Sequence, residues 1–190
     1  MKIEFDKILK DKYGIIFGNK KLIFIKTGRG GSCYGHNNKY LNFANKISKL
    51  YGYSVVISSY PAESICNLQE EFEEIKSYIA DYEDVYFIGI SAGALLGAQQ
   101  GYLNDKITRM LLVNGPLMIN WPKTKRGIER FQGESVEMIY GTKDPSYRYY
   151  EILNCINSDK FICTAIEKAD HNFAGMEEIL ESKMREFIQV

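Results

Sequence analysis

The chain has little histidine and tryptophan and no excess of either charge. Of its 190 residues, two are histidine and one is tryptophan, and 24 basic side chains are balanced by 24 acidic ones. A nucleic-acid-binding surface needs a patch or stripe of basic residues. No segment of this chain has one. The composition therefore argues against nucleic-acid binding.

Long hydrophobic runs are also missing. The longest apolar runs have the length of a strand, so no membrane-spanning helix is expected. The first six residues, Met1 to Asp6, alternate charged and apolar side chains, unlike a signal peptide. The four cysteines are widely spaced and match no metal-binding pattern; they are Cys33, Cys66, Cys155 and Cys163. We therefore expect free thiols in a cytoplasmic protein.

Apolar runs and helical periods alternate along the chain. Strands are predicted over 1–9, 13–17, 21–26, 54–58, 85–88, 110–113 and 161–166, with one more beginning at Val136. A turn at 17–20 is expected to close a hairpin between 13–17 and the strand at 21–26. Helices are predicted over 37–50, 64–80, 94–100 and 174–188. Strands that alternate with helices indicate a parallel sheet, and the length fits a single α/β domain over 1–190.

Four glutamates occur close together in the helix predicted at 64–80. They are Glu70, Glu71, Glu73 and Glu74. Paired carboxylates can bind a metal, but the pattern is more typical of a solvated helix face. We expect no metal site here.

A Gly-x-Ser-x-Gly pentapeptide, Gly89 to Gly93, lies between a predicted strand and a predicted helix. In this setting the sharp turn strains the backbone of Ser91 and lifts its hydroxyl above the sheet. Gly89 and Gly93 supply the small residues needed where strand and helix crowd together. The pattern predicts a nucleophile elbow at Ser91.

A candidate acid and a candidate base follow Ser91 along the chain. Asp144 comes at the end of the strand that begins at Val136, and His171 lies in the loop before the last helix. The order Ser, Asp, His is that of one large class of serine hydrolases. Asp144 could instead be a turn residue before Pro145, and Asp170 is a competing acid, although neighbours in an extended loop point apart. The other histidine, His36, precedes the serine and so has the wrong order.

The glycine-rich segment at 27–32 follows the strand at 21–26. Glycines let the backbone turn so that an N–H group points at a developing oxyanion. We expect the N–H groups of Arg29 and Ala92 to be the donors. A phosphate-binding loop is the alternative, but the spacing of Gly28, Gly30 and Gly31 matches neither nucleotide-binding pattern.

The four motifs at 27–32, 89–93, 141–144 and 170–173 together resemble those of the α/β-hydrolase superfamily. The resemblance implies a doubly wound, mostly parallel sheet with helices on both faces, and an active site at the carboxyl ends of the strands. It also implies an ester, thioester or amide substrate cleaved through an acyl-enzyme. Thr27 stands where lipases and esterases of this superfamily have a histidine. Cys33, close to this loop, has no placed base and is interpreted as structural.

A cap often follows the strand after the elbow helix in this superfamily. Here that segment is short, about 115–134, so we expect a lid-like loop or one short helix and an open pocket. Gly28 and Trp121 are candidate substrate contacts, and Trp121 could equally anchor its own loop. The basic residues Lys123, Lys125 and Arg126, with Arg29, could favour an acidic substrate, or they could simply be solvated.

The functional prediction is a serine hydrolase that acts on a small acyl substrate. Ser91 is the expected nucleophile, His171 the general base and Asp144 the group that orients the imidazole. This chemistry needs no metal and no organic cofactor. Two alternatives remain at this stage: an acyltransferase that uses the same triad, and a non-catalytic binding module on the same fold.

Overall fold

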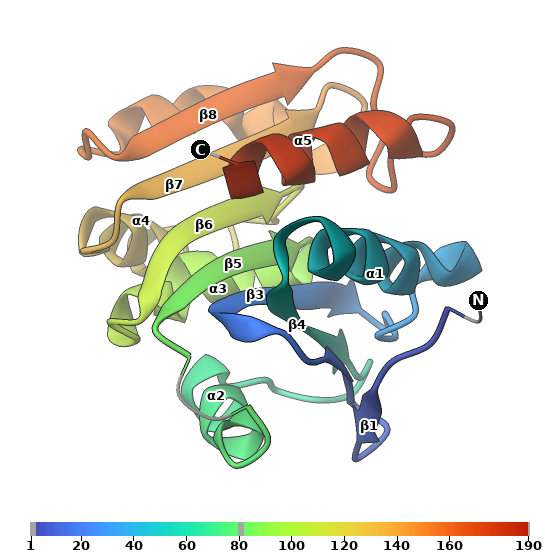
Figure 1. The fold of residues 1–190 in the computed structure, drawn as a ribbon. Helices are drawn as coiled ribbons and strands as arrows, with labels where there is room; N and C mark the ends of the chain where they lie inside the picture. Colours follow the sequence, from blue (N-terminus) through green and yellow to red (C-terminus); the bar gives the residue numbers. More distant parts are fainter. Residues whose placement is uncertain (1–2, 80–81, 190) are drawn as a thin grey trace.

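The computed structural model describes residues 3–79 and 82–189 and contains one eight-stranded sheet (Figure 1). The strands are β1 (Lys7–Leu9), β2 (Tyr13–Ile16), β3 (Asn19–Arg29), β4 (Tyr53–Tyr60), β5 (Asp84–Ile90), β6 (Ile107–Val113), β7 (Ser135–Gly141) and β8 (Phe161–Ile166). The helices are α1 (Lys39–Tyr51), α2 (Leu68–Lys76), α3 (Ala92–Gln100), α4 (Trp121–Glu129) and α5 (Glu177–Gln189). Three 3₁₀ segments complete the elements: η1 (His36–Asn38), η2 (Gly101–Leu103) and η3 (Pro145–Cys155).

The strand order is β1-β2-β4-β3-β5-β6-β7-β8. Six neighbouring strands pair in parallel, in the spatial order β4, β3, β5, β6, β7 and β8. The other two, β1 and β2, form an antiparallel edge next to β4. Buried apolar residues cover both faces: α1 and α5 pack on one, and α2, α3 and α4 on the other (Figure 1). The predicted doubly wound, mostly parallel sheet with helices on both faces is confirmed.

The amino-terminal hairpin differs from the prediction. β2 pairs with β1 and β4 and not with β3, so the turn at 17–20 does not close a hairpin onto β3. The reason is that both edges of β3 are occupied, by β4 and by β5. The first strand is also shorter than the predicted 1–9: β1 begins at Lys7, and Met1 and Lys2 lie outside the described residues.

The second and last helices begin later than the sequence suggested. The α2 helix starts after Asn67, whose side chain accepts hydrogen bonds from the N–H groups of Gln69 and Glu70 and so caps the helix. Ala80, the expected end, lies outside the described residues. The α5 helix begins at Glu177 because residues before it form a loop with a left-handed turn at Gly175.

The carboxyl ends of the parallel strands lie together along one edge of the sheet, as parallel pairing requires. The four sequence motifs described above lie at or just after the carboxyl ends of β3, β5, β7 and β8. None of the helices in the described part of the chain is both long and apolar enough to span a membrane.

Candidate active site

Ser91 lies on a strained turn between β5 and α3. Its backbone has φ 53° and ψ −115°, a conformation that a residue with a side chain rarely adopts and that needs support from its surroundings. The two glycines provide that support. A Cβ atom at Gly89 would lie 2.6 Å from the carbonyl oxygen of Gly93, and one at Gly93 would lie 2.2 Å from that of Lys26. The strand and helix can therefore approach closely only with glycine at both positions.

His171 joins Ser91 to Asp144. Its Nε2 lies 3.0 Å from the Ser91 Oγ, and its Nδ1 is hydrogen-bonded to Oδ2 of Asp144. The Asp144 side chain is fully buried, whereas that of His171 is 42% exposed. A carboxylate can only accept, so Nδ1 carries the proton and Nε2 is the acceptor for the serine hydroxyl. The three side chains thus form a continuous hydrogen-bonded chain from solvent to the interior.

Asp144 is held by its own backbone neighbours. It lies three residues after the end of β7, and its Oδ1 accepts a hydrogen bond of 2.6 Å from the N–H of Ser146, at the start of η3. The turn role considered from the sequence is therefore present together with the contact to His171, because the two oxygens serve different partners.

Asp170 has a different role from Asp144. Its Oδ1 accepts hydrogen bonds from the N–H groups of Asn172 and Ala174, at 2.9 and 3.0 Å. These bonds lower the pKa of the Asp170 carboxyl. The structure thus places this carboxylate within the turn of the loop, and it is Asp144 that contacts the His171 ring.

Asn114 connects the acid loop to the histidine loop, a role the sequence analysis did not identify. It follows β6, is fully buried and has a left-handed φ of 49°. Its Nδ2 donates to the carbonyl oxygens of Asp170 and His171, at 3.1 and 3.0 Å, and its Oδ1 accepts from the N–H of Gly141 at 2.8 Å. One feature of the sequence could have pointed to Asn114: asparagine tolerates a left-handed φ, and this one lies between an apolar strand and Gly115.

The loop at 27–32 packs directly against the serine. A Cβ atom at Gly28 would lie 3.1 Å from the Ser91 Cβ, so glycine leaves room at this contact. The Thr27 hydroxyl lies 3.0 Å from the carbonyl oxygen of Gly31 and 3.2 Å from that of Ser58. Thr27, at the position where lipases and esterases of the superfamily have a histidine, therefore links the loop to β4.

The end of β3 lies between β4 and the turn that contains Ser91. The N–H of Gly30 donates to the carbonyl oxygen of Tyr60 on β4, at 2.7 Å. Arg29 is the last residue of β3, whose register with β4 shifts between Lys26 and Arg29, and the other edge of β3 pairs with β5. There the ladder between β3 and β5 ends at the pair Lys26 and Gly89, just before Ser91.

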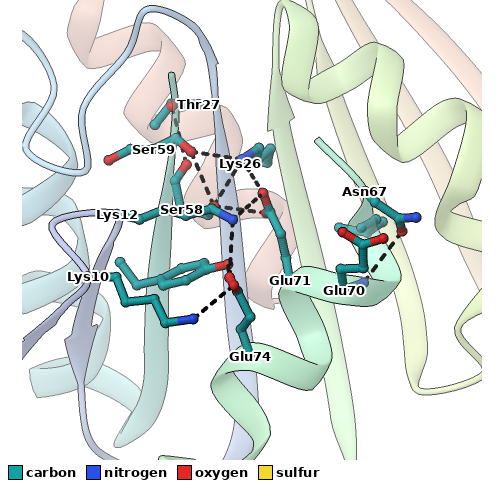
Figure 2. Close-up of polar contacts among 12 residues, drawn as sticks. Lys10, Lys12, Lys26, Thr27, Ser58, Ser59, Asn67, Glu70, Glu71 and Glu74 are labelled. Carbon is teal, nitrogen blue, oxygen red and sulfur yellow. Dashed lines mark hydrogen bonds and ion pairs between the residues drawn. The ribbon is translucent and has the colours of Figure 1, made fainter. Parts of the chain in front are cut away.

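A buried ion pair lies beneath the same loop (Figure 2). The Lys26 ammonium is fully buried and donates to Glu71 Oε1 at 2.7 Å, to the Ser59 carbonyl oxygen at 2.8 Å and to Ser58 Oγ at 3.0 Å. Ser58 Oγ also donates to the second Glu71 oxygen at 2.9 Å. The Ser59 hydroxyl in turn accepts the N–H of Cys33. The network ties the ends of β3 and β4 to α2.

Glu71 corrects the expectation of a solvated glutamate face on this helix. Only 1% of Glu71 is exposed, because its carboxylate meets Lys26 from β3. Glu74, one turn later, is nearer the surface. Its carboxylate accepts hydrogen bonds from the Tyr13 hydroxyl and from the ammonium groups of Lys10 and Lys12. Figure 2 labels the two lysines. These contacts hold the pKa of Glu74 at about 2. Among the described residues, no group of three or more His, Cys, Asp or Glu side chains is arranged to hold a metal ion.

A cavity of about 470 Å³ opens beside Ser91 and His171. Its walls are the loop at 27–32, the start of α1, and the histidine loop; they include Gly28, Arg29, His36, Lys39, Tyr40 and Asn172. Cys33 is buried and is not one of the lining residues, and burial raises the pKa of its thiol.

The predicted lid-like segment at 115–134 does not cover the cavity beside Ser91. Its helix α4 packs against α3, where a Cβ atom at Gly127 would lie 2.1 Å from the Ala98 carbonyl oxygen. Trp121 packs against the apolar core on that face, and Lys125 pairs with Glu129. Neither Trp121 nor the basic residues Lys123, Lys125 and Arg126 line the cavity beside Ser91.

No protein-family model and no curated protein sequence matches the chain. Its structure, however, is similar to that of Est1E from Butyrivibrio proteoclasticus, solved with ferulic acid bound, with a TM-score of 0.73 and 12% identity over 93% of each chain. It is also similar to an α/β serine hydrolase homologue from Coxiella burnetii, with a TM-score of 0.68 and 16% identity over 90% of this chain and 88% of that one. The mouse α/β hydrolase domain-containing protein 10 matches over 99% of this chain and 98% of its own, with a TM-score of 0.67 and 12% identity. With these neighbours and this sheet, the chain has the α/β-hydrolase fold.

Proposed function

We propose that the protein is a serine hydrolase that cleaves an ester, thioester or amide bond of a small acyl substrate through an acyl-enzyme on Ser91. The observation that carries the proposal is the hydrogen-bonded chain from the Ser91 hydroxyl through His171 to the buried Asp144. A serine alcohol is a weak nucleophile until a positioned base accepts its proton, and this geometry supplies such a base.

In the acylation step the Ser91 Oγ attacks the acyl carbonyl carbon while its proton passes to Nε2 of His171. The oxygen–carbon bond to Ser91 forms, and the bond to the leaving group breaks as the imidazolium returns the proton to it. Asp144 keeps the ring in the required tautomer and stabilises the imidazolium through Nδ1. Water then attacks the acyl-enzyme with His171 again as base, releasing a carboxylic acid and free Ser91.

The proposed oxyanion donors are the N–H groups of Arg29 and Ala92. Arg29 lies at the end of β3, whose ladder with β5 ends at Gly89, two residues before Ser91. Ala92 is the first residue of α3, where N–H groups have no partner within the helix. By comparison with other acyl-transfer enzymes, one such donor contributes about 3 kcal/mol to transition-state stabilisation. Gly28 supports the hole by leaving space between loop and serine.

Esters are the first bond type to test, since esterases are among the proteins with a similar structure. All four cysteines are free, which favours a reducing compartment, and we propose that the enzyme acts in the cytoplasm.

The test is hydrolysis of short-chain 4-nitrophenyl esters by wild type, Ser91→Ala and His171→Gln. We expect turnover by the wild type and a loss of about 10³-fold or more in kcat/KM for each variant, because the triad acts as a unit. Ser182→Ala, on α5 and away from the cavity, is the matched control and should hydrolyse the esters as the wild type does. Turnover that survives in Ser91→Ala, or its absence in folded wild type across esters, thioesters and amides, would contradict the proposal.

A further inference from the structure

The cavity beside Ser91 has basic side chains in its walls and no acidic ones. Arg29, His36 and Lys39 line it, and none of the lining residues among those the structure describes is Asp or Glu. Its volume of about 470 Å³ suits a small organic ligand. Asp144 is buried behind the imidazole, and both of its carboxylate oxygens accept hydrogen bonds, one from His171 and one from Ser146.

Among these basic side chains, Lys39 has the least compensation from nearby acidic groups. It is half-buried at the start of α1, with its ammonium 5.2 Å from the centre of the Tyr40 ring. Burial lowers the pKa of Lys39, and the charge of Glu177 opposes that shift only in part. Glu177 accepts the N–H of Gly175, and no ion pair within 4.0 Å joins it to Lys39 across the described residues.

Other lysines at comparable positions do have carboxylate partners. Lys46, two turns further along α1, pairs with Glu181 at 2.8 Å. Lys26, on the far side of the loop at 27–32, pairs with Glu71. A partly desolvated ammonium without such a partner gains more from an anion than a solvated one does, because less water screens the attraction.

Arg29 also lines the cavity, although its guanidinium is held by two residues that do not. Its guanidinium donates to the Ala62 carbonyl oxygen at 2.8 Å and lies over the Tyr60 ring. A guanidinium has five N–H donors, so this anchoring leaves the fork able to face a carboxylate.

From this geometry we propose that the substrate is anionic: it has a carboxylate that binds Lys39 while its acyl carbonyl meets Ser91. The proposal rests on the hydrolase function proposed above and narrows its substrate class to acyl esters with a negative charge within the reach of this cavity. The basic residues suggested from the sequence, Lys123, Lys125 and Arg126, are not part of this site.

The test compares matched neutral and anionic esters in two series. In the acyl series, the 4-methylumbelliferyl hemiester of glutarate is compared with the 5-methylhexanoate ester, which has the same branched end without charge. In the leaving-group series, 3-carboxyphenyl butyrate is compared with 3-carbamoylphenyl butyrate. The readout is the ratio of kcat/KM for the anionic ester to that for its neutral partner.

In at least one series, we expect the wild type to show a kcat/KM ratio of about ten in favour of the anionic ester. One charge-assisted hydrogen bond is enough to account for a preference of that size. Lys39→Gln should lower that ratio about tenfold, and Lys39→Arg should restore much of it. Lys49→Gln is the matched control: it removes the same charge from an exposed position on α1 that does not line the cavity, so its ratio should equal that of the wild type. Raising the salt concentration should lower the wild-type ratio.

Two failures are distinguishable. If the neutral esters are hydrolysed and Ser91→Ala abolishes their turnover, but the ratio in both series is one or less or does not change in Lys39→Gln, the anionic-substrate proposal is overturned and the hydrolase function stands. If no ester of either kind is hydrolysed by the folded wild type, the anionic-ester proposal is overturned, and the hydrolase function is overturned with it when thioesters and amides are not cleaved either.

Discussion

Two lysines flank the loop at 27–32, and their surroundings differ sharply. Lys26 is fully buried beneath the loop and donates to a carboxylate, a carbonyl oxygen and a hydroxyl (Figure 2). Lys39 lies on the other side, half-buried in the cavity wall beside Ser91, with an aromatic ring as its neighbour and no ion pair in the described residues.

The difference separates a charge used for structure from one available to a ligand. The ammonium of Lys26 has three oxygen partners, which is what a buried cation needs. The interactions of Lys39 leave room for an anion, and it lies within the same cavity as the nucleophile. Removing the first charge should therefore affect stability, and removing the second should affect substrate choice.

The largest effect is expected where the buried pair is broken. Lys26→Met removes the buried cation of Glu71 and leaves only the partly exposed Lys12, at 3.2 Å, as its ion-pair partner among the described residues. We expect the free energy of unfolding to fall by about 3 kcal/mol in urea titrations. The double variant Lys26→Met with Glu71→Leu removes both charges and should recover most of that loss. A single variant that loses less than about 1 kcal/mol would show that the pair is not the structural device described above.

The uncharged connection at Asn114 should have a smaller effect on stability and a clear effect on catalysis. Asn114→Ala leaves the N–H of Gly141 and two carbonyl oxygens without their partner, costing about 2 kcal/mol. Because the acid and histidine loops then lose their link, we expect kcat to fall about tenfold with little change in KM. Asn104→Ala, which removes a turn hydrogen bond to Lys106 far from the site, is the control and should leave kcat unchanged. An unchanged kcat in Asn114→Ala would contradict this role.

Glu74, at the exposed end of the Lys26 network, should contribute least to the free energy of unfolding, and its contribution should depend on pH. The Tyr13 hydroxyl and Lys10 hold the pKa of Glu74 at about 2, below the usual 4.5. The stabilisation from a carboxylate with a lowered pKa is present above the unfolded-state value and is lost as the pH falls toward the folded-state value. Between pH 4.5 and pH 2 the wild type should therefore lose up to about 1 kcal/mol that Glu74→Gln lacks.

The measurement is the difference between wild type and Glu74→Gln in free energy of unfolding, compared at pH 5 and at pH 2.5. Other carboxylates cancel in this difference, because both proteins contain them. A difference that stays constant across this range would mean that Glu74 is not stabilised in its charged form.

Much of the fold was accessible from sequence because its signals are local. The alternation of apolar strands and helical periods predicted the parallel sheet, and the glycines around Ser91 predicted a tight turn. What was missed depends on residues far apart in the chain. Glu71 lies 45 positions after Lys26, so nothing near it indicates burial. Likewise, the pairing of β2 with β4 follows from β3 being enclosed on both edges.

The candidate site divides in the same way. Ser91, Asp144 and His171 follow strand ends in a recognisable order, which made them predictable as a set. Lys39 and Asn114 have no such motif, because each acts through groups brought close only when the sheet and its loops are assembled. Conversely, the basic residues after Trp121 drew attention through their clustering in sequence, although α4 packs away from the cavity.

The most direct test of the central claim, that Ser91 is an activated nucleophile, is reaction with a fluorophosphonate probe followed by intact mass measurement. We predict a single adduct on the wild type, none on Ser91→Ala, and strongly slowed labelling of His171→Gln, since the imidazole must accept the serine proton. An unlabelled wild type with a cooperative unfolding transition, or an adduct retained in Ser91→Ala, would contradict the account.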